Sequence, residues 1–366
     1  MPTLLTILGT SAILLILWDA LETILLPRTV DRKFGLTTLY FSRLDRLFQF
    51  VGKRLRCDKN RRERILGAYA PIAMLLLLAF WATGLILCFA VIHLALGTSM
   101  TTDSVASFGE YCYFSATTFF TLGFGDITPV ASAGRTLAVL EAGLGFGFLA
   151  LMIGYIPVLY QNFSRREATI LLLDARAGSP PSAGTLLARQ FSQPAALESL
   201  LAELERWAAS LLESYLSYPI LAYYRSQHAQ MSWLSAVAMT LDTCAFIVAT
   251  ADETDPGQKS LKHQAELTFA LNRHMLVDLA YVLGAEPHQP QEDRLTPQNW
   301  ESLVRSVGPQ RQGPEQFADV TRLRSEYEPY LAGLASNLFL DLQPWLLEET
   351  SLDSWQTSAW DEGAHF

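Results

Sequence analysis

Long apolar stretches alternate with polar ones in the first part of the chain, and they predict three membrane-spanning helices. They cover residues 3–26, 68–96 and 136–160, and each is long enough for the roughly 20 residues with which an α-helix crosses a bilayer. Residues 105–119, between the second and third stretches, are too few and too polar to cross. The pattern therefore predicts an all-α membrane protein.

The first span, residues 1–27, is followed by a strongly basic segment, residues 28–66. Twelve Lys and Arg against four Asp and Glu lie within residues 28–64. Such loops stay on the cytoplasmic side of the membrane, so the first span should end in the cytoplasm. We do not expect it to be a signal peptide, because it lacks a basic start and a small-residue cleavage site.

Within the basic segment, apolar residues recur at helical spacing and basic residues flank them. This pattern is typical of an amphipathic helix that lies along the inner membrane surface and binds anionic lipids. An ordinary helix packed on a cytoplasmic domain is the alternative. Because the segment lies between two spans, membrane lipid is the expected partner and nucleic acid is not. The apolar positions are Leu36, Leu39, Tyr40, Leu44, Leu47, Phe48, Val51 and Leu55.

The remainder of the chain is more polar. Residues 166–195 contain a run rich in Gly, Pro, Ser and Ala, which predicts a linker, and residues 196–366 are predicted to form an acidic cytoplasmic helical domain. From residue 170 onward, twelve Lys and Arg face twenty-five Asp and Glu. Apolar residues at helical spacing favour a small helical bundle. Residues 233–249 resemble a fourth span, but the stretch is short and contains Asp242, so we expect a buried core helix.

One motif defines the candidate chemistry. The sequence Thr-Leu-Gly-Phe-Gly-Asp occupies residues 121–126, directly after the short helical segment. A dehydrated potassium ion needs rings of oxygen atoms in place of its water shell. An extended backbone can direct successive carbonyl oxygens to one side only if its handedness alternates, and Gly123 and Gly125 accept positive φ at little cost. Thr121 can add its hydroxyl, and the Asp126 carboxylate can concentrate cations at the outer mouth.

This motif, between a preceding and a following span, resembles the pore loop of the prokaryotic potassium channel family. The resemblance covers roughly Ala68 to Tyr160, within a predicted two-span pore domain at residues 67–165. It implies a homotetramer in which Thr121, Leu122, Gly123, Phe124 and Gly125 line a selectivity filter for K⁺. Phe124 stands where tyrosine is commoner in the family, so the phenolic hydrogen bond that braces the filter is lost. Thr117 stands where some relatives have a glutamate behind the filter. Gly134 and Arg135 follow Asp126 at the spacing of simple two-span channels.

Three glycines in the third span call for an explanation, since each costs up to about 1 kcal/mol relative to alanine inside a helix. Gly143, Gly145 and Gly147 are spaced by two residues. Gly145 matches the position at which the inner helix of the family is thought to bend, which makes the three residues candidate hinges. Close helix packing is the alternative.

Acidic residues within spans are candidates for function. Asp19 and Glu22 share one face near the end of the first span, where pairing with Arg28 or Arg32 is the simpler explanation. Glu141, in the third span, should face protein or the pore and not lipid.

The sequence contains no catalytic or nucleotide-binding motif, no span with regularly spaced arginines and no paired-cysteine metal motif. We therefore expect a potassium-selective channel of the inner membrane, not an enzyme, with no voltage sensor and no cofactor beyond the permeant ion. A weakly selective cation channel and a non-conducting membrane sensor remain the alternatives.

Overall fold

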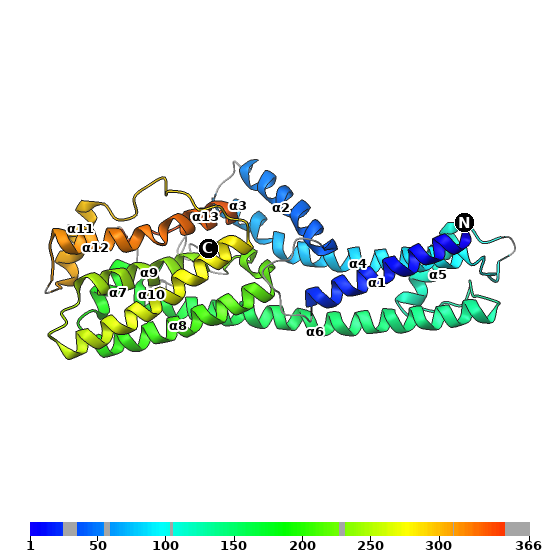
Figure 1. Cartoon of the computed structure of the whole chain (residues 1–366), viewed down its shortest axis with the longest axis horizontal. Helices are drawn as coiled ribbons and strands as arrows, with labels where there is room; N and C mark the ends of the chain where they lie inside the picture. The colour runs from blue at the N-terminus through cyan, green and yellow to red at the C-terminus, as the bar shows by residue number, and fades with distance from the viewer. Residues whose placement is uncertain (25–34, 55–58, 103–104, 227–230, 310, 348–366) are drawn as a thin grey trace, which may run out of the picture. The chain divides into compact units, whose positions relative to one another are not determined.

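The computed structural model describes residues 1–24, 35–54, 59–102, 105–226, 231–309 and 311–347 (Figure 1). Over these residues the chain is helical, and its one isolated β-bridge pairs Met100 with Pro129. The chain forms two compact units. Met1–Arg56 and Ala68–Tyr160 make the first, and Cys57–Gly67 and Gln161–Phe366 make the second.

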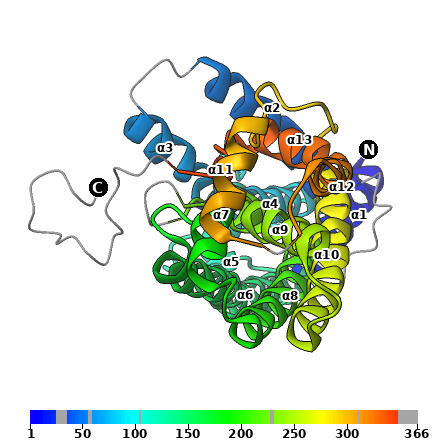
Figure 2. The same cartoon turned by 90° about the vertical axis from the view of Figure 1, so that its left-hand side faces the viewer.

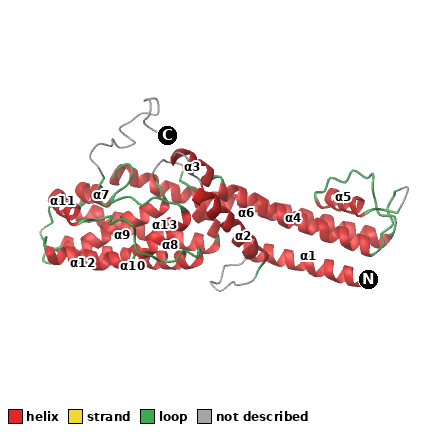
Figure 3. Cartoon of the chain, turned by 90° about the horizontal axis from the view of Figure 1, so that it is seen from above, coloured by secondary structure: helices red, strands yellow, loops and turns green. Residues whose placement is uncertain are grey.

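The first unit is built on two long helices that pack side by side, α1 and α4 (Figures 1 and 3). Small residues allow this approach. A Cβ atom added at Gly9 of α1 would lie 2.8 Å from Ile92, and one added at Gly84 of α4 would lie 2.9 Å from Ile16. The helices of this unit are α1 (Pro2–Ile24), α2 (Leu36–Arg54), α4 (Tyr69–Ala95), α5 (Phe108–Phe119) and the first part of α6 (Ser132–Ala177).

The second unit is a bundle around α9, which lies among its other helices when the bundle is viewed end-on (Figure 2). It contains α3 (Lys59–Gly67), the last part of α6, α7 (Ala183–Gln190), α8 (Pro194–Ser217), the short 3₁₀-helix η1 (Pro219–Tyr223), α9 (Trp233–Thr250), α10 (Pro256–Val282), α11 (Pro297–Val307), α12 (Pro314–Ser325) and α13 (Glu328–Leu338).

By length and composition, four helices of the described chain could cross a membrane: α1, residues 61–95, α6 and α9. In α9, 94% of the apolar window is buried inside the unit, against 22–39% for the other three. A helix enclosed on all sides by its own bundle has no face left for lipid. The prediction of a core helix at residues 233–249 is therefore confirmed.

The predicted linker at residues 166–195 is wrong. Helix α6 runs to Ala177 and α7 begins at Ala183, and the side chains of Leu173, Leu186 and Leu187 are fully buried. The Gly- and Pro-rich composition produces only the short turn between these helices. Apolar residues on both sides of that turn place the segment in the core of the second unit.

Three predicted boundaries also move. The pore helix begins at Phe108, not at residue 105, because Ser107 caps it. The helix predicted over residues 136–160 begins at Ser132 and continues past Pro157 to Ala177, although the first unit ends at Tyr160, where the span was predicted to end. The predicted basic segment, residues 28–66, divides between the units, because α3 belongs to the second.

Candidate pore and its supporting contacts

The predicted filter segment has the alternating backbone that its residue types suggested. Gly123 and Gly125 have φ of +58° and +78°. Thr121, two residues before Gly123, has φ of +56°. Positive φ is uncommon for a threonine and is retained only where the surroundings enforce it. The sequence had indicated this backbone for the two glycines and not for Thr121.

Helix α5 holds the start of this segment. Its first turn is fixed by a capping box in which the Ser107 hydroxyl accepts from the Glu110 N–H, and the Glu110 carboxylate accepts from the Ser107 N–H at 2.6 Å. Near its other end, the Thr117 carbonyl accepts from the N–H groups of Leu122 and Gly123, at 2.8 and 3.3 Å. The chain therefore folds back onto its own helix where the filter begins.

A tyrosine that the sequence did not mark contacts Asp126, the residue predicted to lie at the outer mouth. The hydroxyl of Tyr113, on α5, donates to the Asp126 carboxylate at 2.8 Å. Phe124 has no hydroxyl with which to brace the filter, so Tyr113 supplies a phenolic hydrogen bond from another position. No local pattern marks this pair, because the partners are thirteen residues apart.

Loops on either side of the filter are also tied together. The Thr101 N–H donates to the Thr128 carbonyl at 2.9 Å, and the Val130 N–H donates to the Ser99 carbonyl at 2.9 Å. A Cβ atom at Gly134 would lie 2.5 Å from the Thr98 side chain. The segment after the filter is thus fixed to the segment after α4.

Of the three candidate hinge glycines, Gly145 lies closest to the end of α5. A Cβ atom built there would lie 1.9 Å from the carbonyl oxygen of Phe119, the last residue of α5. At Gly143 and Gly147 the same atom meets nothing within 4 Å in the described chain. Close packing, the alternative left open by the sequence, therefore accounts for Gly145 in this conformation.

Part of this region matches a known protein family. A family model described as "Ion channel" matches residues 73–162. This part of the chain is an ion channel domain. It contains α4, α5, the predicted filter segment and the membrane-length part of α6, so the chain is a multi-pass membrane protein that includes an ion channel domain.

The similarity to one relative extends beyond the channel domain. An uncharacterized membrane protein of Bacillus subtilis (strain 168), YdjJ, is 24% identical to this chain over 284 residues, covering 73% of this chain and 81% of the relative. That length is too great for the channel domain alone, so part of the second unit is shared. No solved structure matches the chain.

Of the three candidate acids of the channel unit, Asp19 and Glu141 are buried. Asp19 accepts from the Thr37 N–H at 3.1 Å, from the Thr37 hydroxyl at 2.5 Å and from the Trp81 indole N–H at 3.0 Å. Its negative charge thereby lies at the N-terminal end of α2, where a helix dipole favours it. Glu22, on the same helix, is half-buried. Arg28 and Arg32, the partners expected for these acids, lie outside the described residues.

Glu141 faces protein, as its sequence context predicts, and its side chain is fully buried. Its nearest charged or titratable neighbour is His93 of α4, whose Nε2 lies 3.8 Å from a Glu141 oxygen. The sequence analysis missed His93, which is one residue in an otherwise apolar span.

In the second unit, the side chain of Arg166 is buried near the end of α6. Its guanidinium donates to the Tyr215 hydroxyl at 2.8 Å and to the carbonyls of Leu221 and Tyr224 at 3.2 and 3.1 Å. The last part of α6 is therefore fastened to the end of α8 and to the turn that follows.

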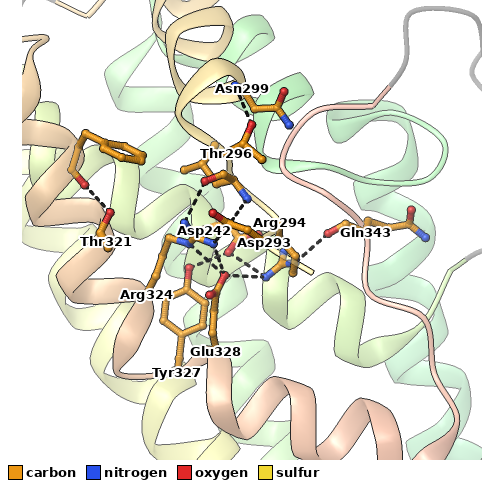
Figure 4. Close-up of polar contacts among 12 residues, drawn as sticks. Asp242, Asp293, Arg294, Thr296, Asn299, Thr321, Arg324, Tyr327, Glu328 and Gln343 are labelled. Atoms are coloured by element: carbon orange, nitrogen blue, oxygen red, sulfur yellow. Dashed lines mark hydrogen bonds and ion pairs between the residues drawn. The ribbon is translucent and has the colours of Figure 1, made fainter. Parts of the chain in front are cut away.

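A second buried polar network explains the acid within α9. Asp242 accepts from Arg294 and, at 2.7 Å, from the Tyr327 hydroxyl (Figure 4). Burial, followed by the negative charge of Asp242, raises the pKa of Tyr327 well above its usual value, so this phenol stays a donor. Arg294 also donates to the Gln343 carbonyl at 2.9 Å, which ties the segment after α13 to the core.

Arg324 extends this network. It donates to Glu328 at 3.0 Å and to Asp293 (Figure 4). Desolvation acts to raise the pKa of the Asp293 carboxyl, but the bonds from Arg324 and from the Leu295 N–H outweigh it and leave that pKa below its usual value. Each buried charge has an opposite partner, which is the arrangement that buried ions require.

Proposed function

We propose that the chain is one subunit of a homotetrameric, potassium-selective channel that conducts K⁺ down its gradient through residues 121–126. The observation that supports this most directly is the alternation of positive φ at Thr121, Gly123 and Gly125 within an ion channel domain. This is the backbone that lets consecutive carbonyl oxygens replace the water shell of a potassium ion.

Each filter residue has a distinct role in this proposal. The carbonyl oxygens of Thr121, Leu122, Gly123 and Phe124 coordinate K⁺, and the Thr121 hydroxyl adds an inner ligand. Gly125 supplies the last backbone reversal. The Asp126 carboxylate, held by Tyr113, raises the local concentration of cations at the mouth.

The exposure of the filter supports an assembly of several chains. All six residues from Thr121 to Asp126 are exposed in a single chain, and Phe124 is 68% exposed. Irregular backbone at membrane depth is tolerated only where protein surrounds it or it lines a water-filled cavity. One pore loop per chain, repeated around an axis, meets both conditions with four copies.

Helix α2 has the surface expected of a helix bound to anionic lipid. Its exposed face combines the apolar side chains Leu39, Leu47 and Phe50 with four basic residues. Apolar groups can enter the headgroup region while the cations bind lipid phosphates. The basic residues are Arg43, Arg46, Lys53 and Arg54. We place this helix at the inner face of the cell membrane and the second unit in the cytoplasm.

Helix α6 provides a route for control of the pore. It belongs to the channel domain at its start and to the second unit at its end, where Arg166 is anchored. A rearrangement of the second unit would therefore act on the pore-forming helix directly. None of the three membrane-length helices of the channel unit has the arginine spacing of a voltage sensor.

Flux through the purified full chain in liposomes tests the proposal. We expect K⁺ flux well above Na⁺ flux in the wild type and its loss in Gly123→Asp, because a side chain at φ of +58° distorts the filter. Gly308→Asp is the matched control, since this glycine also has positive φ, +68°, but ends α11. It should conduct like the wild type.

Other outcomes point to the two alternatives. Equal K⁺ and Na⁺ flux in the wild type would overturn potassium selectivity and favour a cation channel. Absence of flux both in the full chain and after removal of residues beyond 177 would favour a non-conducting sensor.

A further inference from the structure

Three elements of the channel unit place a polar side chain at one buried point behind the pore helix. His93 comes from α4, Ser115 from α5 and Glu141 from α6, and each is 0% exposed. His93 Nε2 lies 3.8 Å from the Glu141 carboxylate, and Ser115 interacts with the same carboxylate. The chain therefore buries an acid–base pair beside the helix that holds the filter.

This pair has fewer hydrogen bonds than its burial requires. Within the described chain, His93 Nε2, the Ser115 hydroxyl and both Glu141 oxygens have no hydrogen bond of normal geometry. Each buried polar group left in this way costs about 1–3 kcal/mol. Apolar residues would fill the site at lower cost, so packing alone does not account for it.

The other groups around the site contact His93 on the side away from Glu141. His93 Nδ1 lies 3.2 Å from the Thr98 hydroxyl, and Tyr111 donates its own hydroxyl to the Thr98 carbonyl at 2.8 Å. The Phe114 ring packs edge-on against the imidazole at 5.2 Å. Nε2 is thus the ring nitrogen directed at Glu141.

Charged groups elsewhere on the packed helices are engaged at other points. On α5, Glu110 bonds the Ser107 backbone. On α6, Arg135 donates to the Pro129 carbonyl at 3.0 Å. On α1, which also packs on α4, Asp19 bonds Trp81, twelve residues before His93 and so about 18 Å away along the helix.

We propose that His93 and Glu141 form a proton-binding site through which pH controls conduction. With one proton between them the pair is neutral overall, either as an ion pair or as two uncharged groups. A second proton leaves one positive charge unpaired in a site closed to water, which is unfavourable unless the structure rearranges. Acidification therefore favours a different arrangement of the helices that meet there.

The route from this site to the filter is short. Ser115 is two residues before Thr117 on α5, and the Thr117 carbonyl accepts from the N–H groups of Leu122 and Gly123. A displacement of α5 on protonation would therefore weaken the contact that holds the filter. We expect acid to reduce flux.

The first test measures flux against pH for the full chain in liposomes, and it rests on the proposed channel function. Wild-type flux should fall about tenfold per pH unit below the midpoint, as for the uptake of one proton. His93→Gln and Glu141→Gln should each abolish this dependence, and Ser115→Ala should shift the midpoint. His274→Gln, which removes an exposed histidine, should keep the wild-type profile.

The second test reads the protons directly, so it holds whether or not the channel selects potassium. Infrared difference spectra of the reconstituted protein should show a protonated-carboxyl band that changes with pH, disappears in Glu141→Gln and shifts its midpoint in His93→Gln. A spectrum without such a band, or a wild-type pH profile in both variants, would overturn the proposal.

Discussion

At the scale of single residues, Gly145 shows how little room surrounds the pore helix. The carbonyl oxygen of Phe119 occupies the space in which any larger residue would place its Cβ atom. Backbone cannot move aside as a flexible side chain can, so an added methyl group must separate α5 from α6.

Gly145→Ala should accordingly destabilise the channel unit by roughly 1–3 kcal/mol, the usual cost of overpacking, and reduce flux. Gly143→Ala is the matched control, because no atom of the described chain lies within 4 Å of the methyl group that it adds. Thermal unfolding and flux in liposomes measure both effects. Equal behaviour of the two variants would contradict the packing explanation.

The bond between Tyr113 and Asp126 allows a second test at this scale. Tyr113→Phe removes the hydrogen bond that the Tyr113 hydroxyl donates to the Asp126 carboxylate, and leaves the ring in place. The outer mouth should then be held less firmly, and the ratio of K⁺ to Na⁺ flux should fall. Tyr281→Phe, on the exposed surface of α10, is the control, and an unchanged ratio in Tyr113→Phe would assign no role to the bond.

The roles of residues that depend on their own backbone conformation could be predicted from the sequence. The roles of residues that depend on contacts between helices could not. Gly123 and Gly125 were identified because few other residues tolerate their backbone. Tyr113 and His93 were missed because their partners, Asp126 and Glu141, lie thirteen and forty-eight residues away. A tyrosine in a pore helix and a histidine in a span look ordinary until the fold brings those partners close.

At the scale of elements, α6 is the helix on which the architecture depends, and neighbouring arginines on it differ sharply. Arg166 is buried and bonded to Tyr215, Leu221 and Tyr224, whereas Arg165 is exposed. Only the first can fasten the helix to the second unit.

Arg166→Gln should destabilise the second unit by about 3 kcal/mol, because its former acceptors stay buried. Labelling of the fully buried Cys244 thiol reports this opening, after the other three cysteines are replaced by alanine. The labelling rate should rise about a hundredfold, given that 1.4 kcal/mol corresponds to a factor of ten. Arg165→Gln should label at the background rate, and an equal rise in both would show that only charge matters.

Element types were predictable here because α1, α4 and the first part of α6 are long apolar runs and α8 has apolar residues at helical spacing, while boundaries were less so. Residues 166–195 were misread because Gly178, Pro180 and Pro181 dominate their composition although only one turn contains them. These residues form the turn. The helices on either side of it form because their apolar residues pack in the core, and composition does not show that packing.

At the scale of the whole molecule, charge divides the chain into a basic early segment and an acidic later part. Replacing Arg43, Arg46, Lys53 and Arg54 with Gln should remove roughly 1 kcal/mol of lipid attraction per charge. Wild-type stability should rise with the fraction of anionic lipid in the liposomes, and that of the variant should not.

The control for this experiment replaces four exposed basic residues of the second unit. The quadruple substitution of Arg206, Lys259, Arg305 and Arg311 with Gln removes the same charge from surfaces outside α2. It should keep the wild-type response to lipid. If both variants lose that response, net charge and not α2 is responsible.

The presence of α3 in the second unit has a consequence for how the chain is made. This helix leaves the ribosome before α4 and the filter, yet the residues that cover it come after α6. Its Leu66 is buried, and its Glu63 pairs with Arg225 at 3.6 Å. Helix α3 and Arg225 can meet only if α4, the pore loop and α6 are inserted so that the chain returns to the side of the bilayer on which α3 lies. Completion of the second unit therefore requires that the pore helices have been inserted correctly.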